Sequence, residues 1–159
     1  MKFKKPKFWD YKKPNLISYI LLPFTLPLII NNFLLNFKKD EKNKQMIKKI
    51  CIGNIYIGGT AKTPLTIKIC KILNNLNLKT ATIKKFYKDQ IDEQIILNRE
   101  TKLYCSKSRK KSINEAIYDK MDIVIFDDGL QDKSINYDLK FVCFNSQTWI
   151  GNGQLIPAG

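Results

Sequence analysis

The sequence predicts an α/β fold with a mostly parallel sheet, preceded by an apolar helical segment near the N-terminus. The sheet is predicted because short apolar runs alternate with stretches of helical periodicity from residue 50 to residue 144. The segment is predicted because residues 14–37 contain 24 consecutive uncharged positions, most of them apolar. Alternating strands and helices imply right-handed crossovers, so neighbouring strands are expected to be parallel. A chain of 159 residues is long enough to bury such a core.

The apolar segment lies between two basic flanks. Residues 1–49 hold 12 of the 28 basic residues and 3 of the 14 acidic ones, and Trp9 and Tyr11 precede the segment. A helix that lies in a membrane interface fits this pattern, with aromatic rings at headgroup level and lysines toward anionic lipid. A spanning helix is one alternative, although Pro23 and Pro27 interrupt it and two positive flanks favour no orientation. A helical hairpin buried in the protein is the other.

The remaining elements follow from local patterns along the chain. Runs of β-prone apolar residues predict strands, apolar residues spaced by three or four predict helices, and asparagine or glycine turns separate them. In chain order the expected elements are a strand at 50–52, a helix at 64–77, a strand at 79–83, a helix at 89–98, a strand at 101–105, a helix at 112–120, strands at 122–126 and 139–144, and a loop at 149–159.

The stretch ICIGNIYIGGTAKTP at residues 50–64 joins the first strand of this sheet to the first helix. A strand, a glycine-rich loop, a Lys-Thr pair and a helix start are the layout of a phosphate-binding P-loop. In such a loop the backbone N–H groups face the phosphates, Lys62 reaches the β- and γ-phosphates, and Thr63 holds Mg²⁺. The predicted nucleotide-binding residues are Tyr56, Ile57, Gly58, Gly59, Thr60, Ala61, Lys62 and Thr63.

Two positions of this loop depart from the G-x-x-x-x-G-K-[ST] pattern. Tyr56 and Ala61 stand where the pattern has glycine, although Gly58 and Gly59 lie between them. If the backbone at Ala61 has a positive φ, the alanine costs about 1–2 kcal/mol relative to a right-handed conformation. An ordinary strand-to-helix turn that precedes a chance Lys-Thr pair is the alternative interpretation.

A pair of carboxylates, Asp127 and Asp128, follows the apolar run at 122–126. Ligands of open parallel sheets bind beyond the carboxyl ends of the strands, so these side chains are expected near Lys62 and Thr63. Carboxylate and hydroxyl oxygens suit Mg²⁺, and the sequence therefore predicts Thr63, Asp127 and Asp128 as metal ligands. A simple Asp-Asp-Gly turn after a strand is the alternative.

Composition argues against several kinds of site. The formal net charge is +14, yet only Arg99 and Arg109 are arginine among the 28 basic residues. Arginine is the usual partner of base edges, so no nucleic-acid partner is expected. The four cysteines form no CxxC pair and the chain has no histidine, which argues against zinc and leaves carboxylates as candidate bases.

Four segments occur in one order along the chain: PKFWDYKKPN at 6–15, GNIYIGGTAKTP at 53–64, DDGLQ at 127–131 and GNGQLIPAG at 151–159. Together they resemble the tetraacyldisaccharide 4'-kinases, the lipid A 4'-kinase family. The resemblance implies a membrane-associated P-loop kinase at the cytoplasmic face of the bacterial inner membrane, peripheral or monotopic. In lipid A (lipopolysaccharide) biosynthesis this family transfers the γ-phosphate of ATP, with Mg²⁺, to the 4'-hydroxyl of an acylated disaccharide lipid, a tetraacyldisaccharide 1-phosphate.

The family's roles carry over to the positions of this chain that match its motifs. The resemblance implies that Lys62 contacts the phosphates during catalysis and that Thr63 contacts Mg²⁺, with Asp127 and Asp128 as the second acidic motif. The residues IDEQ around Asp92 resemble the family's Gly-Asp-Glu-Pro, whose aspartate is proposed to help activate the sugar hydroxyl. Asp92 is therefore the candidate catalytic base, and an ordinary solvated carboxylate at a helix start is the alternative.

The chain also departs from the family's pattern. The residues KKFY at 84–87 stand near the family's Ser-Arg-Gly-Tyr, and Asp132 replaces the histidine that usually follows the DDG-x-Q motif. Two parts are expected, a basic and apolar membrane-associating segment at 1–49 and a P-loop kinase domain at 50–159. Because family members continue beyond the PAG motif into a second domain, the chain is expected to be the N-terminal half of such an enzyme.

Two rival functions remain open beside the lipid kinase. One is a membrane-associated P-loop ATPase that works as a switch, since its phosphate loop has a similar pattern. The other is a truncated, non-catalytic fragment that binds membranes. The acyl chains of the substrate and the oligomeric state are not predicted by the sequence.

Overall fold

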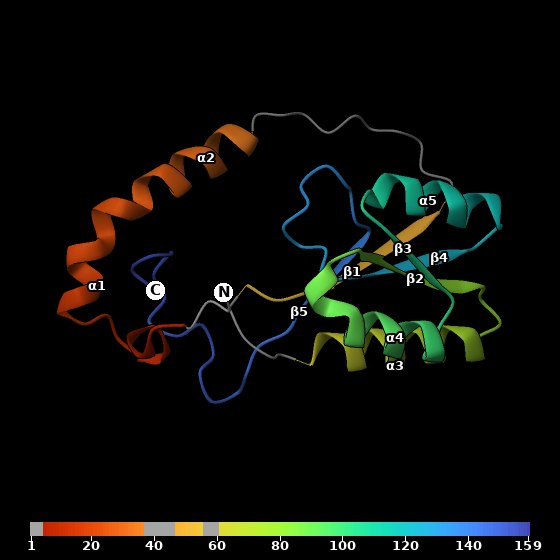
Figure 1. Cartoon of the computed structure of the whole chain (residues 1–159), viewed down its shortest axis with the longest axis horizontal. Coiled ribbons are helices and arrows are strands. Elements are labelled where there is room, and N and C mark those ends of the chain that lie inside the picture. The colour runs from red at the N-terminus through yellow and green to blue at the C-terminus, as the bar shows by residue number, and fades with distance from the viewer. Residues whose placement is uncertain (1–4, 37–46, 56–60) are drawn as a thin grey trace. The chain divides into compact units, whose positions relative to one another are not determined.

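The computed structural model describes residues 5–36, 47–55 and 61–159. These residues form two compact units, which are described separately (Figure 1). The first unit contains residues 5–36, Ile55 and 144–159, and the second contains residues 47–54 and 61–143. The sequence predicted a division between residues 49 and 50, whereas the structure groups residues 144–159 with the N-terminal segment.

The second unit is built on a parallel sheet. Its strands are β1 (Lys48–Gly53), β2 (Thr80–Lys85), β3 (Leu103–Ser106), β4 (Ile123–Asp127) and β5 (Leu139–Val142). Their order across the sheet is β3-β2-β4-β1-β5, and every pair of neighbours is parallel. The predicted α/β class with a parallel sheet is confirmed.

Helices cover both faces of this sheet, as Figure 1 shows. On one face lie α3 (Lys62–Asn75) and α4 (Ile91–Glu100), and on the other lies α5 (Arg109–Tyr118). A short 3-10 turn at Lys88–Gln90 leads into α4. Each helix follows a strand and returns the chain to the edge of the sheet at which the strands begin. This is the crossover that parallel strands need.

Alternate residues of the central strands supply the two cores. Cys51, Val124 and Phe126 pack with Ala116 on the α5 side. On the other face Ile52 and Ile125 pack with the α3 residues Leu65, Cys70 and Leu73. Burial on both faces explains why β4 appears in the sequence as an uninterrupted apolar run rather than as an alternating one.

The predicted elements all occur, and their ends differ by a few residues. The helix α3 begins at Lys62, two residues before its predicted start, so Pro64 lies inside its first turn. The strand β2 runs on to Lys85, two residues past its predicted end. The last strand, β5, is an exposed edge strand that ends at Val142 instead of continuing to residue 144.

The first unit contains the apolar segment, which is helical. It consists of α1 (Leu16–Leu21), a 3-10 turn at Leu22–Thr25 and α2 (Leu26–Asn36). Pro23 lies in the 3-10 turn and Pro27 in the first turn of α2, where a missing N–H costs little. The run Leu16–Leu34 is 19 residues long with a mean hydropathy of 1.6, which is long and apolar enough to cross a membrane.

The C-terminal motif GNGQLIPAG packs against the N-terminal segment within this first unit. The Trp9 indole Nε1 donates to the Pro157 carbonyl at 3.0 Å, and the Asn152 N–H donates to the Trp9 carbonyl at 3.1 Å. The Asn152 amide also donates to Ser18 Oγ and to the Ala158 carbonyl, both at 2.9 Å. Two motifs at opposite ends of the sequence therefore form one hydrogen-bonded structure.

Candidate functional site

The carboxyl ends of three neighbouring strands bring the polar residues of the second unit together. The register places Asp127 of β4 beside Ile52 of β1 on one side and beside Lys84 of β2 on the other. The chain leaves β1 at Gly53 and enters α3 at Lys62, so the start of α3 lies above the same edge. This is the edge at which open parallel sheets bind their ligands.

Asp127 is the centre of this cluster. It is the last residue of β4 and is fully buried. Its Oδ2 accepts hydrogen bonds from Thr63 Oγ1 at 3.1 Å and from Lys84 Nζ at 2.7 Å. Its Oδ1 accepts a longer bond from Thr66 Oγ1 at 3.4 Å. The first turn of α3 is therefore tied to the end of β4 through one carboxylate.

Lys62 and Asp128 form the second part of the cluster. The Lys62 ammonium donates to Asn54 Oδ1 at 2.7 Å and lies 3.3 Å from Asp128 Oδ1. Both charged side chains are partly exposed, so the ammonium remains within reach of a ligand above the strand ends. The prediction that Lys62 and Thr63 lie beside Asp127 and Asp128 agrees with this geometry.

The entry to α3 has the backbone conformation that the glycine of a P-loop would favour. Ala61 is the N-cap of α3 and has a φ of 53° and a ψ of 29°, in the left-handed region. An L-residue there is strained by about 1–2 kcal/mol. Of the predicted nucleotide-binding residues, Ala61, Lys62 and Thr63 are described; Tyr56, Ile57, Gly58, Gly59 and Thr60 lie outside the described residues.

Lys84 and Glu93 belong to the cluster but were not predicted as site residues. Lys84 is 2% exposed, and its Nζ donates to Glu93 Oε2 at 2.6 Å as well as to Asp127. Burial acts to lower the pKa of Lys84, but the ion pairs with Asp127 and Glu93 raise it above its ordinary value. The only feature of the sequence that set Lys84 apart is that it stands near the position at which the family that the chain resembles has serine.

Asp92, the candidate base, is not drawn into this network. It is exposed in the first turn of α4, and none of the hydrogen bonds or ion pairs among residues 5–36, 47–55 and 61–159 involves it. Its neighbour Glu93 is the residue of α4 that reaches the strand ends. Asp92 therefore lies next to the cluster in the chain, and its catalytic role stays a prediction.

The loop after β4 is held by Arg109 and Tyr137. Arg109 at the start of α5 donates through Nη2 to the Asp128 carbonyl at 2.6 Å and through Nη1 to Asp132 Oδ2 at 3.1 Å. The Tyr137 hydroxyl donates to the Gly129 carbonyl at 2.9 Å. Burial acts to raise the pKa of Asp132, but bonds from Ser134 and Arg109 keep it below its ordinary value. The departure from the family's histidine thus supplies a carboxylate partner for Arg109.

Gly53 and Gly129 allow the loop after β4 to pack closely against its neighbours. A Cβ on Gly53 would lie 2.6 Å from Cγ of Leu130, and a Cβ on Gly129 would lie 2.7 Å from the Tyr137 hydroxyl oxygen. Real Cβ atoms do not approach other heavy atoms so closely, so both glycines are needed for close packing. Gly53 lies one residue beyond the predicted strand at 50–52 and is the last residue of β1.

The donor set suits a magnesium ion that also contacts phosphate. Mg²⁺ is commonly held by one or two carboxylates together with substrate phosphates, and all its ligands are hard oxygens. Thr63 Oγ1 and Asp127 Oδ2 are two such atoms 3.1 Å apart, whereas Asp128 is turned to Lys62. Within the described ranges no cluster of three or more His, Cys, Asp or Glu side chains could hold a metal by itself.

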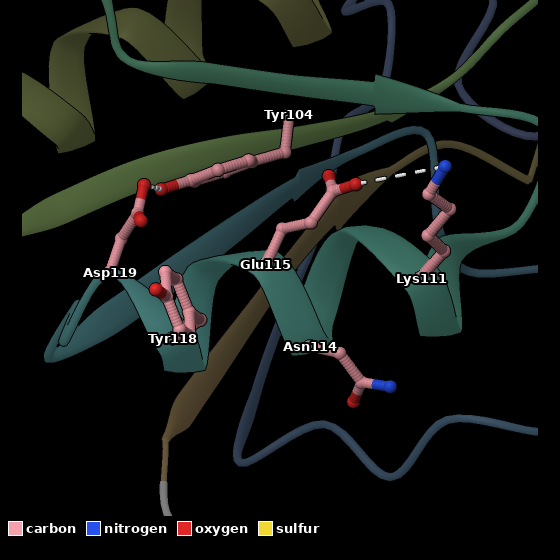
Figure 2. Close-up of a pocket in the computed structure, with 6 residues that line it drawn as sticks. All are labelled: Tyr104, Lys111, Asn114, Glu115, Tyr118 and Asp119. Atoms are coloured by element: carbon pink, nitrogen blue, oxygen red, sulfur yellow. Dashed lines mark hydrogen bonds and ion pairs between the residues drawn. The ribbon is translucent and has the colours of Figure 1, made fainter.

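A separate cavity of about 620 Å³ lies beside α5 (Figure 2). Its lining residues are Tyr104, Lys111, Asn114, Glu115, Tyr118 and Asp119. Figure 2 shows Tyr104 and Asp119 pointing toward each other, and their side chains are hydrogen-bonded at 2.5 Å. Tyr104 and Asp119 therefore satisfy each other, and none of the lining residues belongs to the cluster at the strand ends.

Comparison with known proteins agrees with this geometry. The family model described as tetraacyldisaccharide-1-P 4'-kinase matches residues 18–159. The tetraacyldisaccharide 4'-kinase of Pelagibacter ubique is 51% identical over 160 residues, which is all of this chain and 50% of that protein. The enzyme of the same name from Rickettsia canadensis is 34% identical over 180 residues, again all of this chain and 53% of that protein. The chain spans about half the length of the curated relatives it matches.

A solved structure shares the fold. The crystal structure described as the "apo" form of LpxK from Aquifex aeolicus in complex with ATP matches with a TM-score of 0.64 and 20% identity. The match covers 80% of this chain and 49% of that one. With the family match over residues 18–159 and the strand-end cluster in place, the chain belongs to the tetraacyldisaccharide-1-P 4'-kinase family.

Proposed function

We propose that this chain carries the ATP-binding part of a kinase that phosphorylates the 4'-hydroxyl of a tetraacyldisaccharide 1-phosphate, a precursor of lipid A. The observation that carries the proposal is the meeting of Lys62 and Thr63, at the start of α3, with Asp127 and Asp128 at the end of β4. Phosphoryl transfer depends on positioning and charge neutralisation, and this cluster offers both. The names of the relatives and the ATP of the Aquifex structure support the same reaction.

Lys62, Thr63, Asp127 and Asp92 would have distinct tasks in this reaction. Lys62, whose ammonium pairs with Asn54 and Asp128 and is partly exposed, would neutralise the β- and γ-phosphates. Thr63 and Asp127 would hold Mg²⁺, which when bound neutralises charge on the phosphates. Asp92, exposed at the start of α4, orients the sugar hydroxyl or accepts its proton.

The apolar helices of the first unit support a place at the membrane surface. Only 11% of the most apolar stretch of Leu16–Leu34 is buried, which favours lipid contact over a buried hairpin. Its exposed large side chains include Leu16, Ile17, Tyr19, Ile20, Phe24, Leu26, Ile30 and Phe33. Such a surface costs free energy in water and gains it in a bilayer. These exposed side chains support a place at a membrane surface, and we propose that this is the cytoplasmic face of the inner membrane, with the chain peripheral or monotopic beside its lipid substrate.

Transfer of labelled γ-phosphate from ATP to the disaccharide lipid in mixed micelles tests the proposal. The wild-type chain is compared with Lys62→Ala, which removes the phosphate contact, and with Lys68→Ala, an exposed lysine of the same helix. We expect transfer to fall by about 100-fold or more in Lys62→Ala, in the range of losing one electrostatic stabiliser. Lys68→Ala should keep it.

Three outcomes would reject the proposal or part of it. Equal transfer by Lys62→Ala and Lys68→Ala would remove Lys62 from the phosphate site. ATP hydrolysis that proceeds without lipid would favour the ATPase switch. No transfer by a wild-type chain that still binds ATP would reject catalysis by this chain alone and favour the non-catalytic fragment.

A further inference from the structure

Lys84 connects two acidic groups that lie on different elements. Its Nζ is 2.7 Å from Asp127 Oδ2, at the end of β4, and 2.6 Å from Glu93 Oε2, in the first turn of α4. The side chain is 2% exposed, Asp127 is fully buried, and Glu93 is 48% exposed. One buried ammonium therefore joins the carboxylate of the metal site to the helix that carries Asp92.

The same oxygen of Asp127 serves two purposes. Oδ2 accepts from Lys84 and also from Thr63, whose hydroxyl is the other protein ligand offered to Mg²⁺. A buried carboxylate needs a cation, and a buried ammonium needs an anion, because either charge alone is costly to remove from water. A metal ion bound to Oδ2 would be the cation that Asp127 needs. Lys84 would then depend on Glu93 for the anion that it needs.

We propose that Lys84 is a positioning residue that competes with Mg²⁺ for Asp127 and couples metal binding to α4 through Glu93. The inference rests on the proposed function, because it assumes that metal and nucleotide bind at this cluster. When the metal takes Oδ2, Lys84 shifts its ion pairing toward Glu93 and draws the start of α4 to the strand ends. No bond is made or broken, and Lys84 keeps its proton throughout.

This coupling predicts opposite effects for removing the charge of Lys84 and for removing the charge of its partner Glu93. Removing the ammonium leaves the metal as the counter-charge that Asp127 needs, so metal should bind more tightly. Removing the charge of Glu93 leaves Lys84 with Asp127 as its remaining carboxylate, so metal should bind more weakly. A purely structural role for Lys84 predicts instead that both changes weaken binding, because both loosen the same cluster.

The measured quantity is the metal factor of nucleotide binding. It is the Kd of a fluorescent ATP analogue in EDTA divided by its Kd with saturating Mn²⁺, determined on the full chain in detergent micelles. A ratio cancels changes that affect nucleotide binding in both conditions, such as partial loss of folded protein. The variants are Lys84→Met, Glu93→Gln and the control Glu100→Gln, which removes a carboxylate at the other end of α4 that pairs with Lys71.

We expect the metal factor to rise about tenfold in Lys84→Met, since a unit charge close to the metal is removed. In Glu93→Gln it should fall about threefold, because Glu93 is half exposed and screened. Glu100→Gln should leave it unchanged. In the double variant, Glu93→Gln should have no further effect once Lys84 is methionine, because Glu93 acts through Lys84.

A lower factor in Lys84→Met, or an equal effect of Glu93→Gln with and without Lys84, would overturn the inference while the proposed function stands. If Lys84→Met does not fold, as judged by circular dichroism, Glu93→Gln decides alone, and an unchanged factor rejects the coupling. A wild-type chain that binds no nucleotide would overturn the inference and the proposed function together.

Discussion

Replacing Ala61 by glycine should stabilise the protein, although it adds no contact. Ala61 is exposed and has a φ of 53°, so its backbone is strained and replacing its methyl group loses little burial. Relief of the left-handed conformation is worth about 1–2 kcal/mol. Glycine also has greater conformational freedom in the unfolded chain, which offsets about 0.4–1 kcal/mol of this stabilisation. The net gain should be about 0.5–1 kcal/mol, or roughly 1–4 °C in Tm for a chain of this size.

Urea unfolding of the full chain in non-ionic detergent measures this gain. Circular dichroism at 222 nm follows the helices, and the fluorescence of Trp9 and Trp149 follows the first unit, because both tryptophans lie there. Only the circular-dichroism transition should move to higher urea in Ala61→Gly. The separation of the two signals locates the gain in the second unit.

Two further glycine variants make the test specific. Lys120, just after α5, has the same φ of 53°, so Lys120→Gly should also gain stability. Lys68 lies inside α3, where glycine should cost about 0.5–1 kcal/mol. If Lys120→Gly gains and Ala61→Gly is neutral or destabilised, the assignment of backbone strain at the entry to α3 is wrong.

Three other predictions test the cluster, its loop and the apolar helices. Gly53→Ala should cost about 1–3 kcal/mol and weaken binding of a fluorescent ATP analogue, because the new Cβ pushes Leu130 and the DDGLQ loop; unchanged stability in urea would contradict this. The folded pKa of Asp132 is lowered, so its stabilisation is complete above the unfolded value near 3.8 and is lost as the pH falls through the folded value. The stability difference between wild type and Asp132→Asn should therefore shrink between pH 6 and pH 2, and a constant difference would refute it. Replacing Ile20 and Phe24 by serine should reduce sedimentation with anionic vesicles at least about tenfold, whereas Tyr118→Ser, an exposed aromatic of the other unit, should not; equal binding by both would argue against membrane contact through α1 and α2.

The sequence already determined the α/β class and the place of the site. Apolar runs such as that of β4 are decided locally, because a strand buried on both faces must be apolar at every position. The residue pairs that follow these runs, Lys62 with Thr63 at a helix start and Asp127 with Asp128 at a strand end, indicated phosphate chemistry. Parallel strands place their carboxyl ends at one edge, so the meeting of these pairs also followed from the sequence.

Only the tertiary structure decided the partners of Lys84 and the grouping of the last residues. Local pattern suggests that a lysine in a strand is exposed, and only the register, which pairs Lys84 with Asp127, shows that it is buried. Likewise Asn152 meets Ser18 across 134 residues of sequence. Periodicity specifies which face of an element is apolar, but contacts between distant polar residues depend on how the elements pack, and that information is not local.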